Sequence, residues 1–403
     1  MKVLLAHPGT QYSFHLARQL ERIGLLHEFW TGFALPEASL PTRVMKRLPK
    51  RTFGTELANR VLYGVPPKKL KTTPLLEWRA LRKIRRGFSS QTVMHERNRS
   101  FQRQIPDSSI ARADIIIGFD TSSWMLAERA AAHGKIFILD QSICHPLAQA
   151  GAQEEALRRF PAWCSTVEPR DPTVLACETK EYNAAARIVV ASGYTRRTLA
   201  EHGVSESKIC VNPYGVDLQR FAPAAQRTPS RRFRFVFVGS IGSRKGVPLL
   251  CEAWRALMPK AAELWLVGPV SPAVQSLIPP LPGLRILGKT KHDDLPSILR
   301  QCDVLVLPSY SEGFGLVLLE AMASGLPIIA TTATAAPDIV AHGREGLILA
   351  PGDVEQLAAC LRRCIEDPQE VSEMATRARA RALSFSWDTY GERWAALLQG
   401  CAA

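Results

Sequence analysis

The chain has 403 residues, of which 46% are apolar and 22% charged, a composition that excludes a disordered chain and is typical of a globular protein. Such a length exceeds one ordinary core and favours two domains. No apolar stretch approaches the roughly 20 residues that cross a bilayer, and the apolar run in MKVLLAHPG is too short for a signal peptide. Nine scattered cysteines without a CxxC pair predict a reducing, cytoplasmic setting.

The positive charge is concentrated in one segment. Residues 42–103 hold 17 Lys and Arg against three acidic residues, a net of +14, which equals the net charge of the whole chain. Within this segment, LEWRALRKIRRGF predicts a basic amphipathic helix, with an apolar face formed by Trp78, Leu81, Ile84 and Phe88. Such a helix either lies on an anionic membrane surface or packs on its own domain with a solvated basic back, and the sequence leaves both open.

The first half of the chain alternates strand and helix patterns. KVLLAHPG (2–9) is typical of a strand that ends in a glycine turn and leads into a helix, whereas residues 28–41 have the short, proline-punctuated character of a connection. Three apolar runs predict buried strands of a parallel sheet: DIIIGFD (114–120), KIFILDQS (135–142) and ARIVV (186–190). After the last of these runs, Ser192 is placed to cap a helix.

A change of composition to Pro, Ala and Arg around residues 222–232 marks an interdomain linker, after which the strand–helix alternation starts again. This organisation predicts an α/β fold with two Rossmann-like, doubly wound parallel sheets facing a cleft. The N-terminal domain is expected over residues 1–225 and the C-terminal domain over 230–385. A last helix, over about 386–403, is expected to pack back on the N-terminal domain.

The stretch VLVLPSYSEGFGLVLLEAMASGLPIIA (304–330) predicts a strand, a glycine-containing turn, an apolar helix and a second strand. Glu312 lies in the turn, and Glu320 lies on the helix, where a carboxylate costs free energy unless hydrogen bonds satisfy it. Because ligands of parallel sheets bind beyond the carboxyl ends of the strands, both are candidate site residues. Without a ligand, they would be a solvated loop Glu and a helix Glu paired with an Arg. Amides expected at the helix N-terminus, where anions bind, are those of Phe314, Gly315 and Leu316.

A second candidate, GSIGSRKG (239–246), follows the first strand of the C-terminal half. Glycines such as Gly242 leave backbone amides accessible, and Arg244 and Lys245 bring two cations to the carboxyl end of that strand. Such a group suits a diphosphate. The spacing is neither that of a P-loop nor that of a dinucleotide fingerprint.

In the N-terminal half, LDQSICHPL (139–147) follows a predicted strand and offers Asp140 and His145. A lone histidine is more often a structural hydrogen-bonding residue than a catalyst, so both roles stay open for His145 at this point. Elsewhere the chain lacks a DxD carboxylate pair of the kind that holds a divalent cation on a diphosphate.

Taken together, these motifs resemble the retaining, GT-B-fold glycosyltransferases of family 4 (glycosyl transferases group 1). The resemblance rests on SEGFGLVLLEAMASGLPIIA, which is similar to the family's E-x7-E element, and is supported by FVGS…RKG, VNPYGVD and CDVLVLPS. It covers about residues 186–385. It implies a metal-independent enzyme without a cofactor, which moves a sugar from a nucleotide-sugar on the C-terminal domain to a glycan or lipid-linked acceptor on the N-terminal domain.

The resemblance also implies roles for individual donor-side residues. Arg244 and Lys245 would hold the diphosphate, although Ser240 stands where family members often carry another Arg. Glu320 would take the ribose hydroxyls. In this fold the departing phosphate usually accepts the proton in a front-face attack, so that no protein nucleophile is needed. The donor sugar and phosphate would be bound by Glu312 together with the amides of Gly313, Phe314, Gly315 and Leu316.

On the acceptor side, the resemblance places His145 and Asp140 near the acceptor and the donor sugar. Gly9, at the end of the first strand, resembles the acceptor-side loop of the family, although the usual second glycine is missing.

Two alternatives remain open on sequence alone. One is a GT-B nucleotide-sugar epimerase, and the other is a non-catalytic membrane- or nucleic-acid-binding protein on a transferase scaffold. Sparse aromatic residues in the basic segment disfavour nucleic acid. The favoured expectation is a cytoplasmic transferase of polysaccharide or glycolipid precursors, whose basic face meets the inner face of the cytoplasmic membrane.

Overall fold

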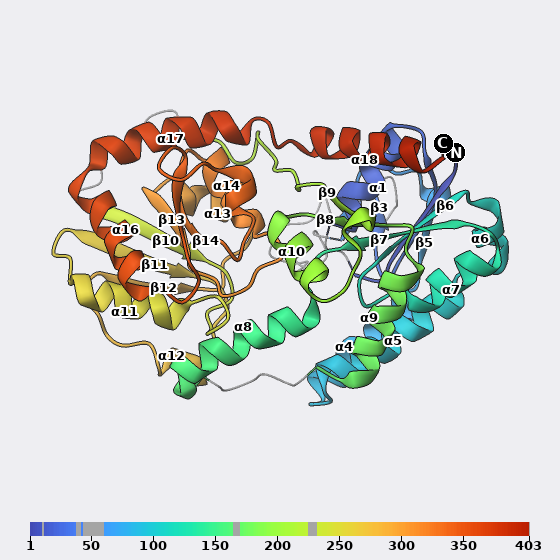
Figure 1. The fold of residues 1–403 in the computed structure, drawn as a ribbon, viewed down its shortest axis with the longest axis horizontal. Coiled ribbons are helices and arrows are strands. Elements are labelled where there is room, and N and C mark those ends of the chain that lie inside the picture. Colours follow the sequence, from blue (N-terminus) through green and yellow to red (C-terminus); the bar gives the residue numbers. More distant parts are fainter. Residues whose placement is uncertain (10–11, 38–41, 43–59, 164–169, 225–231, 403) are drawn as a thin grey trace.

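The computed structural model describes residues 1–9, 12–37, 42, 60–163, 170–224 and 232–402. These residues form two α/β domains, which lie side by side in Figure 1, the N-terminal one in blue to green and the C-terminal one in yellow to red. The predicted fold class is confirmed, because both domains are built on parallel sheets. A large part of the predicted basic segment, residues 43–59, lies outside the described residues.

The N-terminal sheet has the strand order β5-β2-β1-β6-β7-β8-β9 in the described part of the chain, and its neighbouring strands are parallel. Chain order reverses between β1 and β6, which creates a topological switch point at their carboxyl ends. The strands are β1 (Val3–His7), β2 (Leu26–Thr31), β5 (Leu70–Thr72), β6 (Ile115–Phe119), β7 (Ile136–Gln141), β8 (Arg187–Val190) and β9 (Ile209–Val211).

Helices cover both faces of this sheet, which explains why all five residues of β1 are buried. Val3 and Leu5 belong to one hydrophobic cluster, whereas Leu4 and Ala6 belong to another on the opposite face. The helices of this domain are α1 (Ser13–Arg22), α4 (Pro74–Arg85), α5 (Ser90–Gln104), α6 (Asp107–Arg112), α7 (Trp124–Ala132), α8 (Pro146–Arg159), α9 (Pro172–Ala184) and α10 (Gly193–Glu201).

The C-terminal sheet has the order β12-β11-β10-β13-β14-β15, again with parallel neighbours. Its switch point lies between β10 and β13. The strands are β10 (Phe233–Val238), β11 (Ala262–Val267), β12 (Leu284–Gly288), β13 (Val304–Leu307), β14 (Ile328–Thr331) and β15 (Gly346–Leu349). The helices are α11 (Val247–Leu257), α12 (Pro272–Gln275), α13 (Leu295–Leu299), α14 (Leu316–Ala323), α15 (Ala336–Ile339), α16 (Val354–Glu366) and α17 (Pro368–Ala382).

The last helix, α18 (Trp387–Ala402), returns to the N-terminal domain and packs along α1 (Figure 1). Trp394 and Leu398 are fully buried. Gln19 donates a hydrogen bond to Asp388 over 3.2 Å. The chain therefore crosses between the domains twice, first after Phe221 and then between α17 and α18.

Short elements complete the description. β3 (Leu35–Pro36) pairs with β4 (Val61–Leu62), outside the main sheets. Single 3₁₀ turns are η1 (Pro67–Lys69), η2 (Pro161–Trp163) and η3 (Glu206–Lys208).

Two sequence predictions are wrong in this part of the fold. The segment predicted as a connection from residue 28 contains most of β2, whose buried Glu28 accepts hydrogen bonds from Trp30 (2.9 Å) and Arg112 (3.2 Å). The buried polar residue Glu28 interrupts the apolar run that would otherwise predict a buried strand. In the basic segment, α4 ends at Arg85, so Phe88 lies beyond the helix instead of on its face.

Candidate functional site

The two motifs of the C-terminal domain lie at its switch point. β10 and β13 are parallel neighbours, so the turns after them, residues 239–246 and 308–315, emerge at the same edge of the sheet. Gly246 has a left-handed backbone (φ 71°), and a Cβ there would lie 1.9 Å from the Pro308 carbonyl oxygen. Gly242 lies in the first turn, where its carbonyl accepts from Val247 N at 3.3 Å. Close approach of the two turns is what brings the motifs together.

Lys245 and Arg244 both face Glu312 across these turns. Lys245 Nζ donates to a Glu312 carboxylate oxygen, and Arg244 Nη1 lies 3.6 Å from that oxygen. Arg244 also donates to the Ser311 carbonyl at 2.8 Å. The Lys245 and Glu312 side chains are only 15% and 18% exposed. Burial and the neighbouring guanidinium lower the pKa of Lys245 to about 7, and the Glu312 carboxylate opposes them by favouring the ammonium form.

A row of free backbone amides adjoins this ion pair. Gly315 caps α14 with a left-handed backbone (φ 84°). None of the amides of residues 313–316 has a hydrogen-bond partner within the described residues. Together with the positive end of the helix dipole, these amides form an arrangement that can bind an anion next to Lys245 and Arg244.

Glu320 sits on α14, is 8% exposed, and has a partner that the sequence analysis missed. His292 Nε2 lies 2.8 Å from Glu320 Oε1. His292 precedes α13 in a polar turn, and a single histidine among Lys and Asp residues gives no sequence signal for such a pairing. The pair joins a carboxylate and an imidazole at a half-exposed position, a combination that can bind hydroxyl groups.

Residues from the N-terminal domain approach the same region. Tyr12 packs against Tyr214 with ring centroids 3.8 Å apart and the ring planes tilted by 32°, and Tyr214 in turn packs edge-on against Phe314 at 5.2 Å. Burial and the nearby carboxylates of Glu320, Asp140 and Asp120 raise the pKa of Tyr12 to about 12. Tyr12 thus lies within electrostatic reach of acidic residues in both domains.

Asp140 is the penultimate residue of β7 and is buried, and its Oδ2 has no hydrogen-bond partner in the described part of the chain. Burial and neighbouring Asp120 hold its pKa well above the usual range of a carboxyl group. Gly9 follows β1, and its carbonyl accepts from Thr31 Oγ1 at 3.3 Å. Both residues therefore stand at the carboxyl edge of the N-terminal sheet, on neighbouring sides of β6.

His145 is placed differently from the other predicted residues. It caps α8, its Nδ1 accepts from Leu147 N at 3.3 Å, and its ring stacks on His202 at 4.2 Å. Burial and His202 lower the pKa of His145 to about 4, so the imidazole is neutral at pH 7. The contacts of this ring are made within the N-terminal domain, and none joins it to Glu312 or Lys245 among the described residues.

The first turn of α10 joins the N-terminal domain to the turn that carries Glu312. Ser192 Oγ and Thr195 Oγ1 both donate to the Gly313 carbonyl, the latter over 3.1 Å. Ser192 also caps α10, as predicted, by accepting from Thr195 N. Ser311 accepts from Tyr194 OH at 3.1 Å and contacts Cys144 Sγ at 3.0 Å. The turn is thereby held by the opposite domain.

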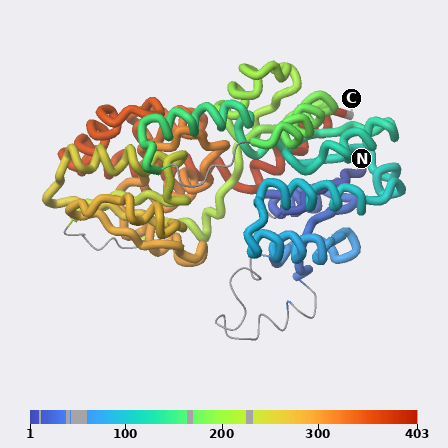
Figure 2. Tube along the Cα trace, turned by 90° about the horizontal axis from the view of Figure 1, so that it is seen from below, coloured from blue at the N-terminus to red at the C-terminus, as the bar shows by residue number. Residues whose placement is uncertain are grey.

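Other contacts between the domains lie outside the turn that carries Glu312. Gly193 N donates to Asp338 at 2.8 Å, and Arg197 donates to the Thr332 carbonyl at 3.1 Å. α8 extends along the C-terminal domain in both views (Figure 1 and Figure 2), where Arg159 donates to the Gly352 carbonyl and pairs with Glu252 at 3.6 Å.

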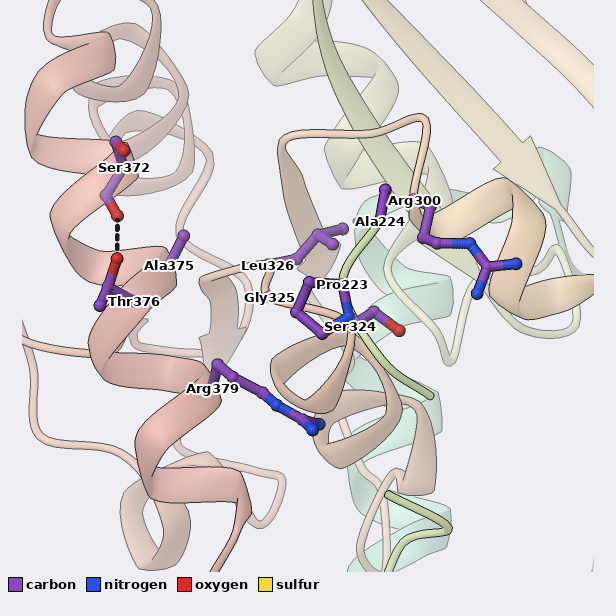
Figure 3. A pocket seen from close by; sticks show the side chains of 10 residues that line it. All are labelled: Pro223, Ala224, Arg300, Ser324, Gly325, Leu326, Ser372, Ala375, Thr376 and Arg379. Atoms are coloured by element: carbon purple, nitrogen blue, oxygen red, sulfur yellow. Dashed lines mark hydrogen bonds between the residues drawn. The ribbon is translucent and has the colours of Figure 1, made fainter. Parts of the chain in front are cut away.

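A pocket of about 330 Å³ lies elsewhere in the C-terminal domain, beside the linker. Figure 3 shows it between α17, the end of α14 and residues Pro223 and Ala224, with Arg300 and Arg379 among its lining side chains. Arg379 donates to the Phe221 and Ala323 carbonyls. The pocket contains none of the predicted site residues.

The exposed surface of α4 contradicts one of the two sequence alternatives, the one in which the apolar face with Trp78 and Leu81 packs on its own domain. Ala80 and Glu77 form the buried side, whereas Trp78 is 56% and Leu81 39% exposed beside the basic residues. Glu77 pairs with Arg97 at 2.6 Å beneath the helix. Three apolar residues of α4, Leu75, Trp78 and Leu81, therefore face outward together with its positive charge.

Within the described residues, no group of three or more His, Cys, Asp and Glu side chains has a metal-binding arrangement. No helix among them has both the length and the apolar character needed to cross a membrane.

Comparison with known proteins identifies what the chain is similar to. Residues 232–367 match the family model described as glycosyl transferases group 1. The MMP α-(1→4)-mannosyltransferase of Mycolicibacterium hassiacum is 27% identical over 98% of this chain and 95% of that protein. The D-inositol 3-phosphate glycosyltransferase of Streptomyces avermitilis is 32% identical over 51% of this chain and 50% of that protein.

Solved structures share the fold of the whole chain. Sucrose-phosphate synthase from Thermosynechococcus elongatus superposes with a TM-score of 0.69 at 20% identity, covering 100% of this chain and 99% of that one. Anabaena HepE, solved in complex with UDP-glucose, gives a TM-score of 0.64 at 17% identity, covering 99% and 100%. These similarities extend over both domains and both sheets.

Proposed function

Because this chain is a glycosyltransferase of group 1 with the GT-B fold, we propose that it transfers a sugar from a nucleotide-sugar to an acceptor, with retention of the anomeric configuration. The observation that carries this proposal is the meeting of Lys245, Arg244, Glu312 and the free amides of residues 313–316 at one switch point. Two cations and a helix N-terminus suit a diphosphate, the leaving group of a nucleotide-sugar.

In the proposed reaction, the C-terminal domain neutralises the charge that develops as the sugar leaves. Lys245, Arg244 and the helix amides stabilise the departing diphosphate, because preorganised donors in a water-poor site stabilise developing negative charge. The diphosphate displaces Glu312 from the cations, which frees that carboxylate to accept hydrogen bonds from the donor sugar. Glu320 and His292 take the ribose hydroxyls. The departing phosphate accepts the acceptor proton, so no protein nucleophile is assigned.

We assign the acceptor to the carboxyl edge of the N-terminal sheet, where Gly9 and Asp140 lie. Tyr12 interacts electrostatically with both Asp140 and Glu320, and so connects this edge with the donor side. His145 has its own structural contacts, so its proposed part is limited to holding the start of α8 next to the turn of Glu312. The outward-facing apolar residues of α4 support a lipid-linked or membrane-associated acceptor, since such a helix can lie on an anionic bilayer.

We further propose that transfer is independent of metal ions, because Lys245 and Arg244 are positioned to supply the positive charge that a divalent cation would otherwise bring. Transfer is therefore expected to continue in excess EDTA. Loss of transfer on chelation, followed by recovery with manganese or magnesium, would contradict this part of the proposal.

The test of the function is donor binding followed by turnover. A thermal-shift screen over UDP-, GDP- and ADP-sugars, beginning with UDP-glucose, is expected to show stabilisation by one nucleotide class. Release of the nucleoside diphosphate is then measured with that donor, and we expect it to fall strongly in Lys245→Ala. If no nucleotide-sugar stabilises the chain and none is turned over, the proposed function is wrong.

A further inference from the structure

The hydroxyl groups of Ser192 and Thr195 belong to the N-terminal domain, yet both donate to the carbonyl of Gly313 in the proposed donor-binding turn. We propose that Ser192 and Thr195 are positioning residues of the transfer reaction, which fix the donor-binding amides across the domain boundary. The inference rests on the proposed function, and it adds that the donor site is completed by the acceptor domain.

The first step of the argument is the geometry of one peptide unit. The Gly313 carbonyl and the Phe314 N–H belong to the same planar trans peptide, in which the two groups point in opposite directions. Holding the carbonyl therefore fixes the direction of the N–H. That N–H is one of the amides without a partner in the described residues, next to Lys245 and Glu312. The hydroxyls of the N-terminal domain thus fix the direction of the Phe314 N–H in the C-terminal domain.

The second step is burial. Ser192 is 0% and Thr195 1% exposed, so their bonds to Gly313 are made out of contact with water. A buried carbonyl that loses its donors is left unsatisfied, which is costly. The turn consequently has a strong preference for the orientation that these hydroxyls impose.

The third step is an independent feature of Gly313 itself. Its backbone is outside the left-handed region, so conformation alone does not require glycine. A Cβ at this position would, however, lie 2.4 Å from the carbonyl oxygen of Ser142 and 3.0 Å from Ile143 Cα, both in the N-terminal domain. Absence of a side chain is needed only because the other domain approaches so closely.

Capping of α10 by Ser192 is a separate role, and the variants must distinguish the two. Ser192→Ala would remove the cap as well as the bond to Gly313, which confounds stability with positioning. Thr195→Val keeps the size and β-branching of the side chain and removes its hydroxyl. It is therefore the primary variant, and Gly313→Ala is the second, because it keeps both hydroxyls and blocks the close approach.

The matched controls alter similar groups without touching the turn. Thr179→Val removes an exposed hydroxyl that donates to Leu175 O within α9. Asp338→Ala removes an interdomain bond, to Gly193 N, that does not contact residues 311–316. If Thr195 acts merely by helping the domains adhere, Asp338→Ala and Thr195→Val will have equal effects.

The experiment measures the affinity for the nucleoside diphosphate by calorimetry, together with kcat and KM for the donor. We expect Thr195→Val to weaken diphosphate binding about threefold to tenfold, as for one lost buried hydrogen bond, with a matching rise in KM for the donor. Gly313→Ala should act in the same direction. Thr179→Val should match the unaltered chain, and Asp338→Ala should change binding less than Thr195→Val.

The outcomes separate this inference from the function on which it rests. Unchanged diphosphate affinity in folded Thr195→Val and Gly313→Ala overturns the positioning role and leaves the glycosyltransferase proposal intact. Equal losses in Thr195→Val and Asp338→Ala overturn it too, in favour of general adhesion. If the unaltered chain binds no nucleoside diphosphate, the proposed function fails and the positioning role fails with it.

Discussion

Replacing Glu312 with glutamine is expected to raise the affinity for a nucleoside diphosphate while lowering sugar transfer. In the structure, the Glu312 carboxylate contacts Lys245 and lies 3.6 Å from Arg244. A diphosphate that uses these cations must displace the carboxylate or bind beside it. Glutamine has nearly the same shape but carries no charge, so it leaves both cations unopposed.

The expected size follows from Coulomb's law. A phosphate charge about 5 Å from the displaced carboxylate is repelled by roughly 1–3 kcal/mol, for an effective dielectric constant between about 80 and 20. The lower half of this range applies, because the side chains are partly exposed. Glu312→Gln should therefore bind the diphosphate about tenfold more tightly, since each 1.4 kcal/mol corresponds to roughly a factor of ten.

Calorimetry with UDP, GDP and ADP at low salt measures this effect, and a turnover assay measures transfer. The matched control is Glu366→Gln, which makes the same change in net charge at an exposed position at the end of α16. It should leave affinity unchanged. If Glu312→Gln binds the diphosphate more weakly than the unaltered chain, the carboxylate supports the phosphate site, and our account of the ion pair is wrong.

Three further predictions concern other parts of the molecule. Lys245→Ala should weaken diphosphate binding by about 1.5–3 kcal/mol in calorimetry, and an unchanged affinity would remove Lys245 from the site. His145→Asn should be less sensitive to acid. Folding lowers the pKa of His145 from 6.5 to about 4, so stability is lost as pH falls below about 6.5. Asparagine can cap without titrating, and urea unfolding at pH 7 and 5 should show a smaller loss by about 1 kcal/mol; equal losses would contradict this account. Finally, vesicles with anionic lipid should bind the chain, and Trp78→Ser should weaken that binding; equal sedimentation with neutral vesicles would refute the membrane role of α4.

Much of the C-terminal domain could be predicted because its signals are local. The strand predicted to open at Val304 is β13, and the helix predicted from Leu316 is α14. Apolar runs between glycine turns specify both elements without reference to distant residues. The positions of Lys245 and Glu312 at the ends of neighbouring strands then follow from the rule for doubly wound sheets.

The parts that could not be predicted depend on distant residues. His292 meets Glu320 only because α13 and α14 pack beside one sheet, and Thr195 meets Gly313 across 118 positions of sequence. Neither residue has a distinctive local pattern. β2 was missed for a related reason, since Glu28 is tolerated inside the strand only through hydrogen bonds from Trp30 and Arg112.

The return of α18 to the N-terminal domain determines how the two halves of the chain behave when the backbone between them is cut. Because α18 packs along α1 and Arg393 donates to Asn212 and to the Pro213 carbonyl, the C-terminal half carries its own anchor to the other half. A protease site engineered within residues 225–231 should therefore nick the chain without separating the fragments. The halves should co-purify and complement each other, whereas a second cut between Leu383 and Ser386 should release the C-terminal domain as a free fragment.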